Sequence, residues 1–292
     1  MSLPHYVRYH FNTQCLLGEG AFYSPRYSSA FWVDIKGNAV FRLHWQSGHL
    51  ETHTFDEPVC WLAERLAGQL FLGCQRSLYL LNPDTWQREK YIEMDQEPLS
   101  NRLNDAKVDR AGRLYFGTMD DAEMRASGSL YLLKGMHEAL PVDTGYQVSN
   151  GPAFSLSGEW LWSVSSADRI IYRCAVNSDG EIVSKQAWIS FTEAMGFPDG
   201  ITVDSEDCLW VAAWDGGGLY RFNAEGERLA FVPLPASKIT SMTFAGEKFD
   251  RLLVTSANIG MTAQELACHP YSGDTFILDV GVKGVATTPC KL

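Results

Sequence analysis

Apolar and polar positions along this chain recur in a fixed order. A short polar or turn-forming residue is followed by an apolar stretch, then by a turn and an aromatic-rich strand, and this pattern occurs six times. The six opening residues are Glu19, Cys60, Asn104, Asn150, Asp199 and Thr240. The steps between them are 41, 44, 46, 49 and 41 residues, a period that indicates a repeat architecture.

Each repeat contains further short segments rich in aromatic and β-branched residues. The second strand of each repeat is predicted at 30–35, 70–74, 114–118, 161–165, 209–213 and 252–256. Turn sequences such as DRAGR and DSEDC precede these strands, and Gly, Asp, Asn or Pro bounds them. Three to four strands in a repeat of about 45 residues are typical of a propeller blade.

The repeat therefore predicts an all-β fold, a six-bladed β-propeller that forms a single domain over residues 1–292. A solenoid would have shorter and more uniform repeats, and a β-sandwich would lack the six-fold recurrence. Residues 259–268 are the one segment that could form a short helix. The N-terminal segment 6–12 is expected to pair with the last blade, because closure removes an exposed sheet edge.

Composition limits the kinds of partner. The chain has 46% hydrophobic residues and a net charge of −11. A negative surface repels phosphate backbones, so nucleic acid is not an expected partner. The sequence has no basic amphipathic stretch, no apolar run long enough for a membrane helix and no secretory signal. We therefore expect no membrane association, no obligate protein partner and a cytoplasmic location.

The seven cysteines are scattered along the chain and include no CxxC pair. Their odd number and their spacing argue against a disulfide framework and against a zinc knuckle. We expect small buried thiols, the usual environment of a free cysteine.

The opening residues of the repeat are the candidates for chemistry. In a propeller the first strands of all blades run alongside one channel, so these positions would converge. Taken singly, Asn150–Gly151 and Asp199–Gly200 are common turn pairs, and Glu19 could be a solvated loop residue. Two carboxylates and two amides at one place would repel unless a cation lay there. Such oxygen ligands suit Ca²⁺, Mg²⁺ or Mn²⁺, and Zn²⁺ and Fe²⁺ are further options.

The segment 101–109, NRLNDAKVD, is the richest in polar groups. Arg102 beside Asn104 offers hydrogen-bond donors for hydroxyl or carbonyl oxygens of a substrate. The alternative is an Arg102 that pairs with an acidic neighbour. The residues alone leave both readings open.

Several stretches match the motifs of one family in the expected order. They are LGEG (17–20), NRLNDAKVD (101–109), GRLYFGTM (112–119), SNGPAFS (149–155) and PDGITVDSEDCLWVAAWDGGGLYRF (198–222). Together they resemble the regucalcin/gluconolactonase family of sugar lactonases, and the resemblance runs through nearly the whole chain. The tail, 255–280, looks most like the bacterial sugar-acid lactonases, including xylonolactonase.

The resemblance implies a six-bladed propeller with one catalytic divalent metal ion, whether Ca, Zn, Mn, Mg or Fe(II). It implies that the metal ligands are Glu19, Asn150 and Asp199, and that Asp199 is also the candidate general base. These two roles of Asp199 oppose each other, because metal contact stabilises the carboxylate and weakens it as a base. Arg102 and Asn104 match the family's substrate-binding positions.

The chain departs from the family pattern near these positions. Ala21 and Tyr23 stand where the family usually has Pro and Trp, and we expect them to alter packing beside the site or the fit of the substrate. The segment 119–129 follows a strand where the family carries a loop over the pocket. Trp214 and Tyr23 could stack on a sugar, although packing between blades is the commoner role of such aromatics.

The implied activity is metal-dependent hydrolysis of an aldono-lactone, of the gluconolactone or xylonolactone type, to the free sugar acid. Its partner would be a small-molecule sugar lactone. One alternative is a metal-dependent phosphotriesterase or aryl esterase on the same scaffold, because fold does not fix function. Another is a non-catalytic metal-binding propeller. A propeller that only binds other proteins would not need Glu19, Asn150 and Asp199 together.

Overall fold

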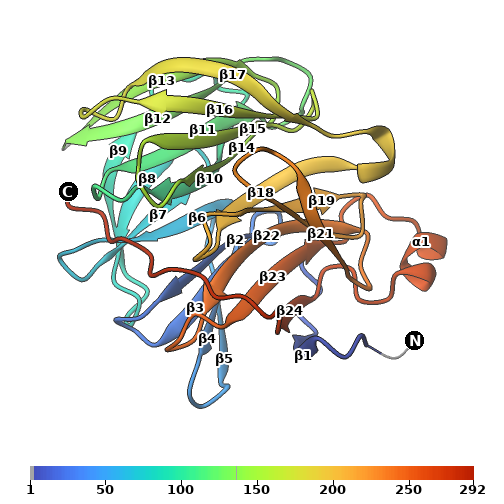
Figure 1. The fold of residues 1–292 in the computed structure, drawn as a ribbon. Coiled ribbons are helices and arrows are strands. Elements are labelled where there is room, and N and C mark those ends of the chain that lie inside the picture. The colour runs from blue at the N-terminus through green and yellow to red at the C-terminus, as the bar shows by residue number, and fades with distance from the viewer. Residues whose placement is uncertain (1–2, 136) are drawn as a thin grey trace. The chain divides into compact units, whose positions relative to one another are not determined.

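The structure is a computed structural model that describes residues 3–135 and 137–292. Within these residues the strands form six four-stranded antiparallel sheets (Figure 1). These sheets are the blades of a β-propeller, so the all-β, six-bladed fold expected from the repeat is confirmed. The chain divides into two compact units, each with three sheets.

The first unit comprises the described residues up to Pro58 together with Phe191–Ala286. Its sheets have the strand orders β2-β3-β4-β5, β18-β19-β20-β21 and β1-β24-β23-β22. The strands are β1 (Val7–Phe11), β2 (Gly18–Ser24), β3 (Ser29–Asp34), β4 (Ala39–His44), β5 (Leu50–Thr54), β18 (Phe197–Val203), β19 (Leu209–Trp214), β20 (Gly218–Phe222), β21 (Arg228–Pro233), β22 (Lys238–Ala245), β23 (Arg251–Ala257) and β24 (Thr275–Leu278). The unit also contains the 3-10 helix η1 (Glu193–Met195) and the α-helix α1 (Ala263–Cys268).

The second unit comprises Val59–Ser190 and Thr287–Leu292. Its sheets have the strand orders β6-β7-β8-β9, β10-β11-β12-β13 and β14-β15-β16-β17. The strands are β6 (Val59–Glu64), β7 (Leu70–Cys74), β8 (Ser77–Leu81), β9 (Arg88–Glu93), β10 (Asn101–Val108), β11 (Leu114–Asp120), β12 (Gly128–Gly135), β13 (Glu138–Tyr146), β14 (Ser149–Phe154), β15 (Trp160–Ser165), β16 (Ile170–Val176) and β17 (Ile182–Ser190).

The ends of the chain and the short helix bear on two further expectations. Strand β1 pairs antiparallel with β24, with Tyr9 opposite Ile277, so the sixth sheet takes its fourth strand from the N-terminal segment. Helix α1 lies within 259–268 and begins with a capping box, in which Thr262 and Glu265 each accept a backbone N–H from the other. The organisation of residues 1–292 as a single domain stays a prediction.

In each sheet, the strand that contains the opening residue of the sequence repeat is irregular at one recurrent place. These strands are β2, β6, β10, β14, β18 and β22. The register against the second strand shifts between Glu19 and Phe22, Val59 and Trp61, Leu103 and Ala106, Asn150 and Ala153, Pro198 and Ile201, and Ile239 and Met242. These are the opening residues of the sequence repeat or their immediate neighbours. A bulge bends the strand and changes the direction of the side chains beside it. The opening position of the sequence repeat therefore coincides with a bulge, or lies next to one, in every sheet.

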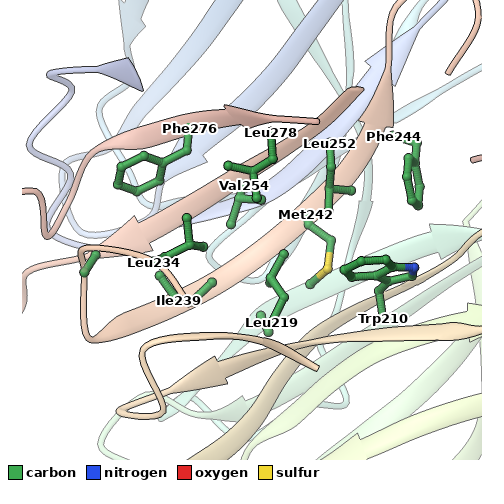
Figure 2. Packing of buried hydrophobic residues seen from close by; sticks show 12 residues of the cluster. Trp210, Leu219, Leu234, Ile239, Met242, Phe244, Leu252, Val254, Phe276 and Leu278 are labelled. Atoms are coloured by element: carbon green, nitrogen blue, oxygen red, sulfur yellow. The ribbon is translucent and has the colours of Figure 1, made fainter. Parts of the chain in front are cut away.

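Apolar side chains pack between two sheets of the first unit (Figure 2). Trp210 of β19 and Leu219 of β20 lie against Met242 of β22, and Val254 and Phe276 continue the cluster. All of these side chains are at most 2% exposed, and each fully buried side chain of this size contributes about 1.5–3 kcal/mol. The packing fixes β22 beside β19, and β22 also packs against β18, which carries Asp199.

The cysteines are free thiols, as expected. Six are buried and one, Cys268, is exposed, so the expectation of buried thiols is wrong at that position. Cys268 ends helix α1, which buries none of its residues. The described helices, α1 and η1, are both too short to cross a lipid bilayer.

Candidate functional site

The two candidate carboxylates, Glu19 and Asp199, belong to the first unit. Both are buried, at 7% and 5% exposure. They lie on β2 and β18, and both strands pack against β22. The approach is close: a Cβ added to Gly200 would meet the Thr240 carbonyl oxygen at 2.7 Å. The structure therefore brings Glu19 and Asp199 to strands that flank one common strand.

Thr240 and Ser241 of β22 fasten the backbone around Glu19. The Thr240 hydroxyl donates to the Gly18 carbonyl oxygen and also contacts Thr255 Oγ1 at 2.8 Å. On the other side of Glu19, the Ala21 N–H donates to Ser241 Oγ at 3.1 Å. The sequence left Thr240 without a role. Its role in the structure is to position the strand that carries Glu19.

We expect Thr240→Val to destabilise the first unit, because it leaves the buried Gly18 carbonyl without its hydroxyl donor. The expected loss is about 1–3 kcal/mol in the free energy of unfolding, measured by urea titration. Thr243→Val is the matched control, since the Thr243 hydroxyl only contacts the neighbouring Phe244 carbonyl at 3.4 Å. Equal stability of the two variants would contradict a positioning role for Thr240.

The second unit brings Arg102, Asn104 and Asn150 into one hydrogen-bonded chain. Arg102 Nη1 donates to Asn104 Oδ1 at 2.6 Å, and Asn104 Nδ2 donates to Asn150 Oδ1 at 2.9 Å. All three side chains are buried. This series of hydrogen bonds begins on β10 and ends on β14, so it connects the bulges of two neighbouring sheets.

Asn104 is fully used as a donor. Its Nδ2 group also donates to the Ser149 carbonyl oxygen at 2.7 Å, so both of its N–H bonds are engaged. Asn150 Nδ2 in turn donates to Ser166 Oγ at 2.9 Å, which directs Asn150 Oδ1 toward Asn104. Both amide oxygens keep a second lone pair. Asn104 and Asn150 can thus still accept a hydrogen bond or bind a cation through oxygen.

Arg102 also has the acidic partner that the sequence left as an alternative. Its Nε atom donates to Asp121 Oδ1 at 2.7 Å, and its Nη1 atom donates to the Leu103 carbonyl oxygen at 2.9 Å. Among the described residues, no acceptor contacts Nη2 of this guanidinium, which is 4% exposed. The ion pair and a substrate contact are therefore compatible, because they use different nitrogens.

Two charged side chains, the buried Asp105 and the half-buried Lys107, follow Asn104 on β10. Burial raises the pKa of Asp105 to about 6, although the Lys107 ammonium and backbone N–H groups of Ala106 and Gly151 act against it. Burial lowers the pKa of Lys107, and the Asp105 charge opposes that change. Both residues belong to the NRLNDAKVD motif, and Asp105 accepts the backbone N–H of Gly151, the residue after Asn150 on β14.

The aromatic and alanine departures from the family pattern have structural explanations. Tyr23 is 2% exposed and packs edge-on against Trp45 and Phe249, so stacking on a sugar is wrong for this residue. Ala21 keeps the backbone N–H that a proline would lack, and Ser241 accepts it. Trp214 is half-buried, and Lys238 Nζ lies 4.4 Å from the centre of its ring.

The chemistry of the donor set fits a divalent cation. Glu19 and Asp199 supply buried carboxylates and Asn150 supplies an amide oxygen. Isolated buried carboxylates are costly, so such groups are normally compensated by a cation or by hydrogen bonds. Within the described parts of the chain, no three His, Cys, Asp or Glu side chains cluster as a metal site. The three candidate ligands fall outside that definition, because Glu19 and Asp199 supply only two such side chains and the third candidate, Asn150, is an amide.

Sequence reasoning missed three partners of the candidate residues. They are Asp121 on Arg102, Ser166 on Asn150 and Ser241 on the backbone beside Glu19. Asp121 stands in the segment 119–129, where the family carries its pocket loop, and its charge was the available signal. The two serines gave no signal, because small hydroxyl residues are common in turns.

Two features together define the class of protein. They are the β-propeller fold and the buried carboxylate, amide and guanidinium groups at or beside the bulges of its first strands. The family model described as SMP-30/gluconolactonase/LRE-like region matches residues 17–258. The match covers most of the chain, and the chain therefore belongs to this family.

The relatives that this chain resembles include named lactonases. It is 31% identical over 272 residues to the 6-deoxy-6-sulfogluconolactonase of Pseudomonas putida, covering 93% of this chain and 94% of the relative. It is 30% identical over 247 residues to the pentonolactonase of Haloferax volcanii, covering 84% and 83%. Lactonases are hydrolases that act on an ester bond.

The fold also matches a solved structure. The crystal structure of a calcium-binding protein, regucalcin, from Agrobacterium tumefaciens superimposes with a TM-score of 0.93 at 25% sequence identity, covering 98% of both chains.

Proposed function

We propose that this protein is a metal-dependent sugar lactonase that hydrolyses an aldono-lactone, of the gluconolactone or xylonolactone type, to the free sugar acid. The observation that supports the proposal most is that two sets of residues agree, one from the structure and one from the family resemblance. The residues that the family resemblance assigns to metal and substrate are buried polar residues at or beside the recurrent bulges. Family membership and relatives named as lactonases support it.

We propose Glu19, Asn150 and Asp199 as the ligands of one divalent ion. Their oxygen donors suit Ca²⁺, Mg²⁺ or Mn²⁺, and Zn²⁺ and Fe²⁺ are further options. When bound, the ion would supply Lewis-acid polarisation of the lactone carbonyl and charge for the developing oxyanion.

The chain's own residues would transfer protons and position the substrate. Asp199 would accept a proton from the attacking water, whose oxygen forms a bond to the carbonyl carbon. The ring C–O bond would then break, and the ring oxygen would leave as a hydroxyl by taking up the proton that Asp199 accepted from the water. Arg102 would donate from Nη2 to a substrate oxygen. Asn104 would hold Arg102 and Asn150 in place and could accept a substrate hydroxyl at Oδ1, which favours attack by fixing geometry.

The proposal predicts lactone hydrolysis that is lost on removal of metal. The protein, purified without added metal, is analysed for bound ions and assayed with gluconolactone, xylonolactone, an aryl ester and an organophosphate triester. We expect lactone turnover that disappears with chelator and returns with one divalent ion. Metal-dependent turnover of only the ester or the triester would favour the alternative hydrolases. Bound metal without turnover of any substrate would favour a non-catalytic metal-binding protein.

A further inference from the structure

The guanidinium of Arg102 is held on two of its three nitrogens. Nε donates to Asp121 Oδ1, and Nη1 donates to two oxygens, the Leu103 carbonyl and Asn104 Oδ1. Three of the five N–H bonds are thereby engaged. The two that are left both belong to Nη2.

This pattern closes the edges that bind anions. A guanidinium grips a carboxylate, sulfonate or phosphate with two parallel N–H bonds from two different nitrogens. Either such edge needs Nη2 together with Nε or with Nη1. In this protein Asp121 occupies the first edge and Asn104 with Leu103 occupies the second. Nη2 alone can serve separate hydroxyl or carbonyl oxygens, which are the groups of an uncharged sugar.

The charge of Asp121 also disfavours the binding of an anion at Arg102. The Asp121 carboxylate lies 2.7 Å from the Arg102 guanidinium and neutralises it. The Asp121 side chain is 39% exposed, so an anionic group that approached Arg102 from solvent would meet a negative charge first. Like charges in such a position disfavour binding.

A second arginine of the second unit also has an acidic neighbour. Arg125 belongs to the loop after β11, and its charge acts on Asp120, the residue before Asp121. The Met124 N–H, and to a lesser extent the Arg125 charge, lower the pKa of Asp120. Each of the two arginines thus has an acidic neighbour, Asp121 for Arg102 and Asp120 for Arg125.

The first unit repeats the arrangement. Lys238 begins β22, two residues before Thr240, and its Nζ atom lies 2.8 Å from Asp215 Oδ1 and over the ring of Trp214. Trp214 pairs with Phe197 at the start of β18, the strand that carries Asp199. Asp215 therefore neutralises the lysine at this end of β22, as Asp121 neutralises Arg102 on β10.

We propose that Asp121 is a specificity-determining residue that makes this site accept uncharged sugar lactones and discriminate against lactones bearing a carboxylate, sulfonate or phosphate. The inference rests on the proposed lactonase function. Asp121 acts through Arg102, by occupying its Nε edge and cancelling its charge. Its effect should therefore fall on KM for anionic substrates more than on kcat for neutral ones.

The test compares gluconolactone with glucarolactone, which carries a carboxylate in place of the C6 hydroxymethyl group. For the native protein we expect a higher kcat/KM on gluconolactone. Asp121→Asn keeps an oxygen that can accept from Arg102 Nε but removes the charge. We expect it to raise the ratio of kcat/KM for glucarolactone over gluconolactone by about five- to ten-fold, mainly through KM.

The matched control is Glu123→Gln. It removes one negative charge from the same loop, and the structure gives Glu123 no contact with Arg102. We expect this variant to keep the native ratio. The proposal is overturned if the native protein uses both lactones equally well, if Asp121→Asn leaves the ratio unchanged, or if Glu123→Gln raises it as much.

Binding without turnover separates this inference from the lactonase proposal. Thermal shift measurements with 1,5-anhydroglucitol, which is neutral, and with glucuronate, which is anionic, need no hydrolysis. We expect the neutral ligand to stabilise the native protein and glucuronate to stabilise only Asp121→Asn. A protein that turns over no lactone yet shows this pattern refutes the lactonase proposal and keeps the inference. Equal binding of both ligands, or binding of neither, refutes the inference.

Discussion

Asp199→Asn is expected to reduce lactone turnover by about 10²- to 10⁴-fold, the contribution typical of a general base. The amide has nearly the shape of the carboxylate and keeps one oxygen that can bind a cation. It cannot accept a proton from water at neutral pH. Asp199 is 5% exposed on β18, packed beside β22, so the substitution should leave the backbone in place. Initial rates on the best lactone measure the effect.

Metal analysis of the same variant separates the two proposed roles of Asp199. A loss of turnover with full metal content assigns the base role, and a loss of both assigns mainly the ligand role. Glu19→Gln provides the comparison, because Glu19 is proposed as a ligand without a proton-transfer role. An Asp199→Asn variant that binds metal normally and keeps near-full turnover would show that Asp199 is not the base.

Asp204→Ala is expected to cost about 3–5 kcal/mol in the free energy of unfolding, because it breaks a buried charge pair. Asp204 is fully buried in the turn after β18, where Oδ2 accepts from Trp210 Nε1 at 2.8 Å and from Arg221 Nε at 2.7 Å. Its Oδ1 accepts the backbone N–H groups of Glu206 and Cys208. The truncation leaves all four donors without this carboxylate. Urea unfolding with a fluorescence readout measures the loss.

Glu206→Gln is the control for Asp204→Ala. Glu206 pairs with the same arginine at 2.6 Å, but its side chain is 62% exposed. Exposed ion pairs contribute at most about 1 kcal/mol, so little change is expected. A similar loss in both variants would mean that the Arg221 pair stabilises through charge alone and not through the buried turn.

The strands and their spacing were predictable because the information is local. Every predicted second strand overlaps an observed one: 209–213 lies within β19 (Leu209–Trp214), and 30–35 is shifted by one residue from β3 (Ser29–Asp34). Turn residues and alternating apolar side chains act over a few positions, so they can be read without the fold. The short helix was located within 259–268, although α1 occupies only Ala263–Cys268.

The candidate site was only partly accessible from the sequence. The motif 101–109 singled out Arg102 and Asn104, and the ion pair on Arg102 was one of two readings left open. Its identity, Asp121, depends on the register in which β11 pairs with β10, which sets Asn101 opposite Asp120 and which no local pattern specifies. The same holds for the reach of Asn104 to Asn150, 46 positions away along the chain.

Residue types and their period were enough to predict a six-bladed all-β propeller and, with the family motifs, to select Glu19, Arg102, Asn104, Asn150 and Asp199. Periodicity survives in one dimension because each blade repeats the same local strands and turns. Which hydrogen atoms of Arg102 are engaged depends on the register in which β10 pairs with β11. The contact of Thr240 with Gly18, and that of Asn104 with Asn150, form only when neighbouring sheets pack together, because that packing brings together side chains that the sequence separates by tens or hundreds of residues.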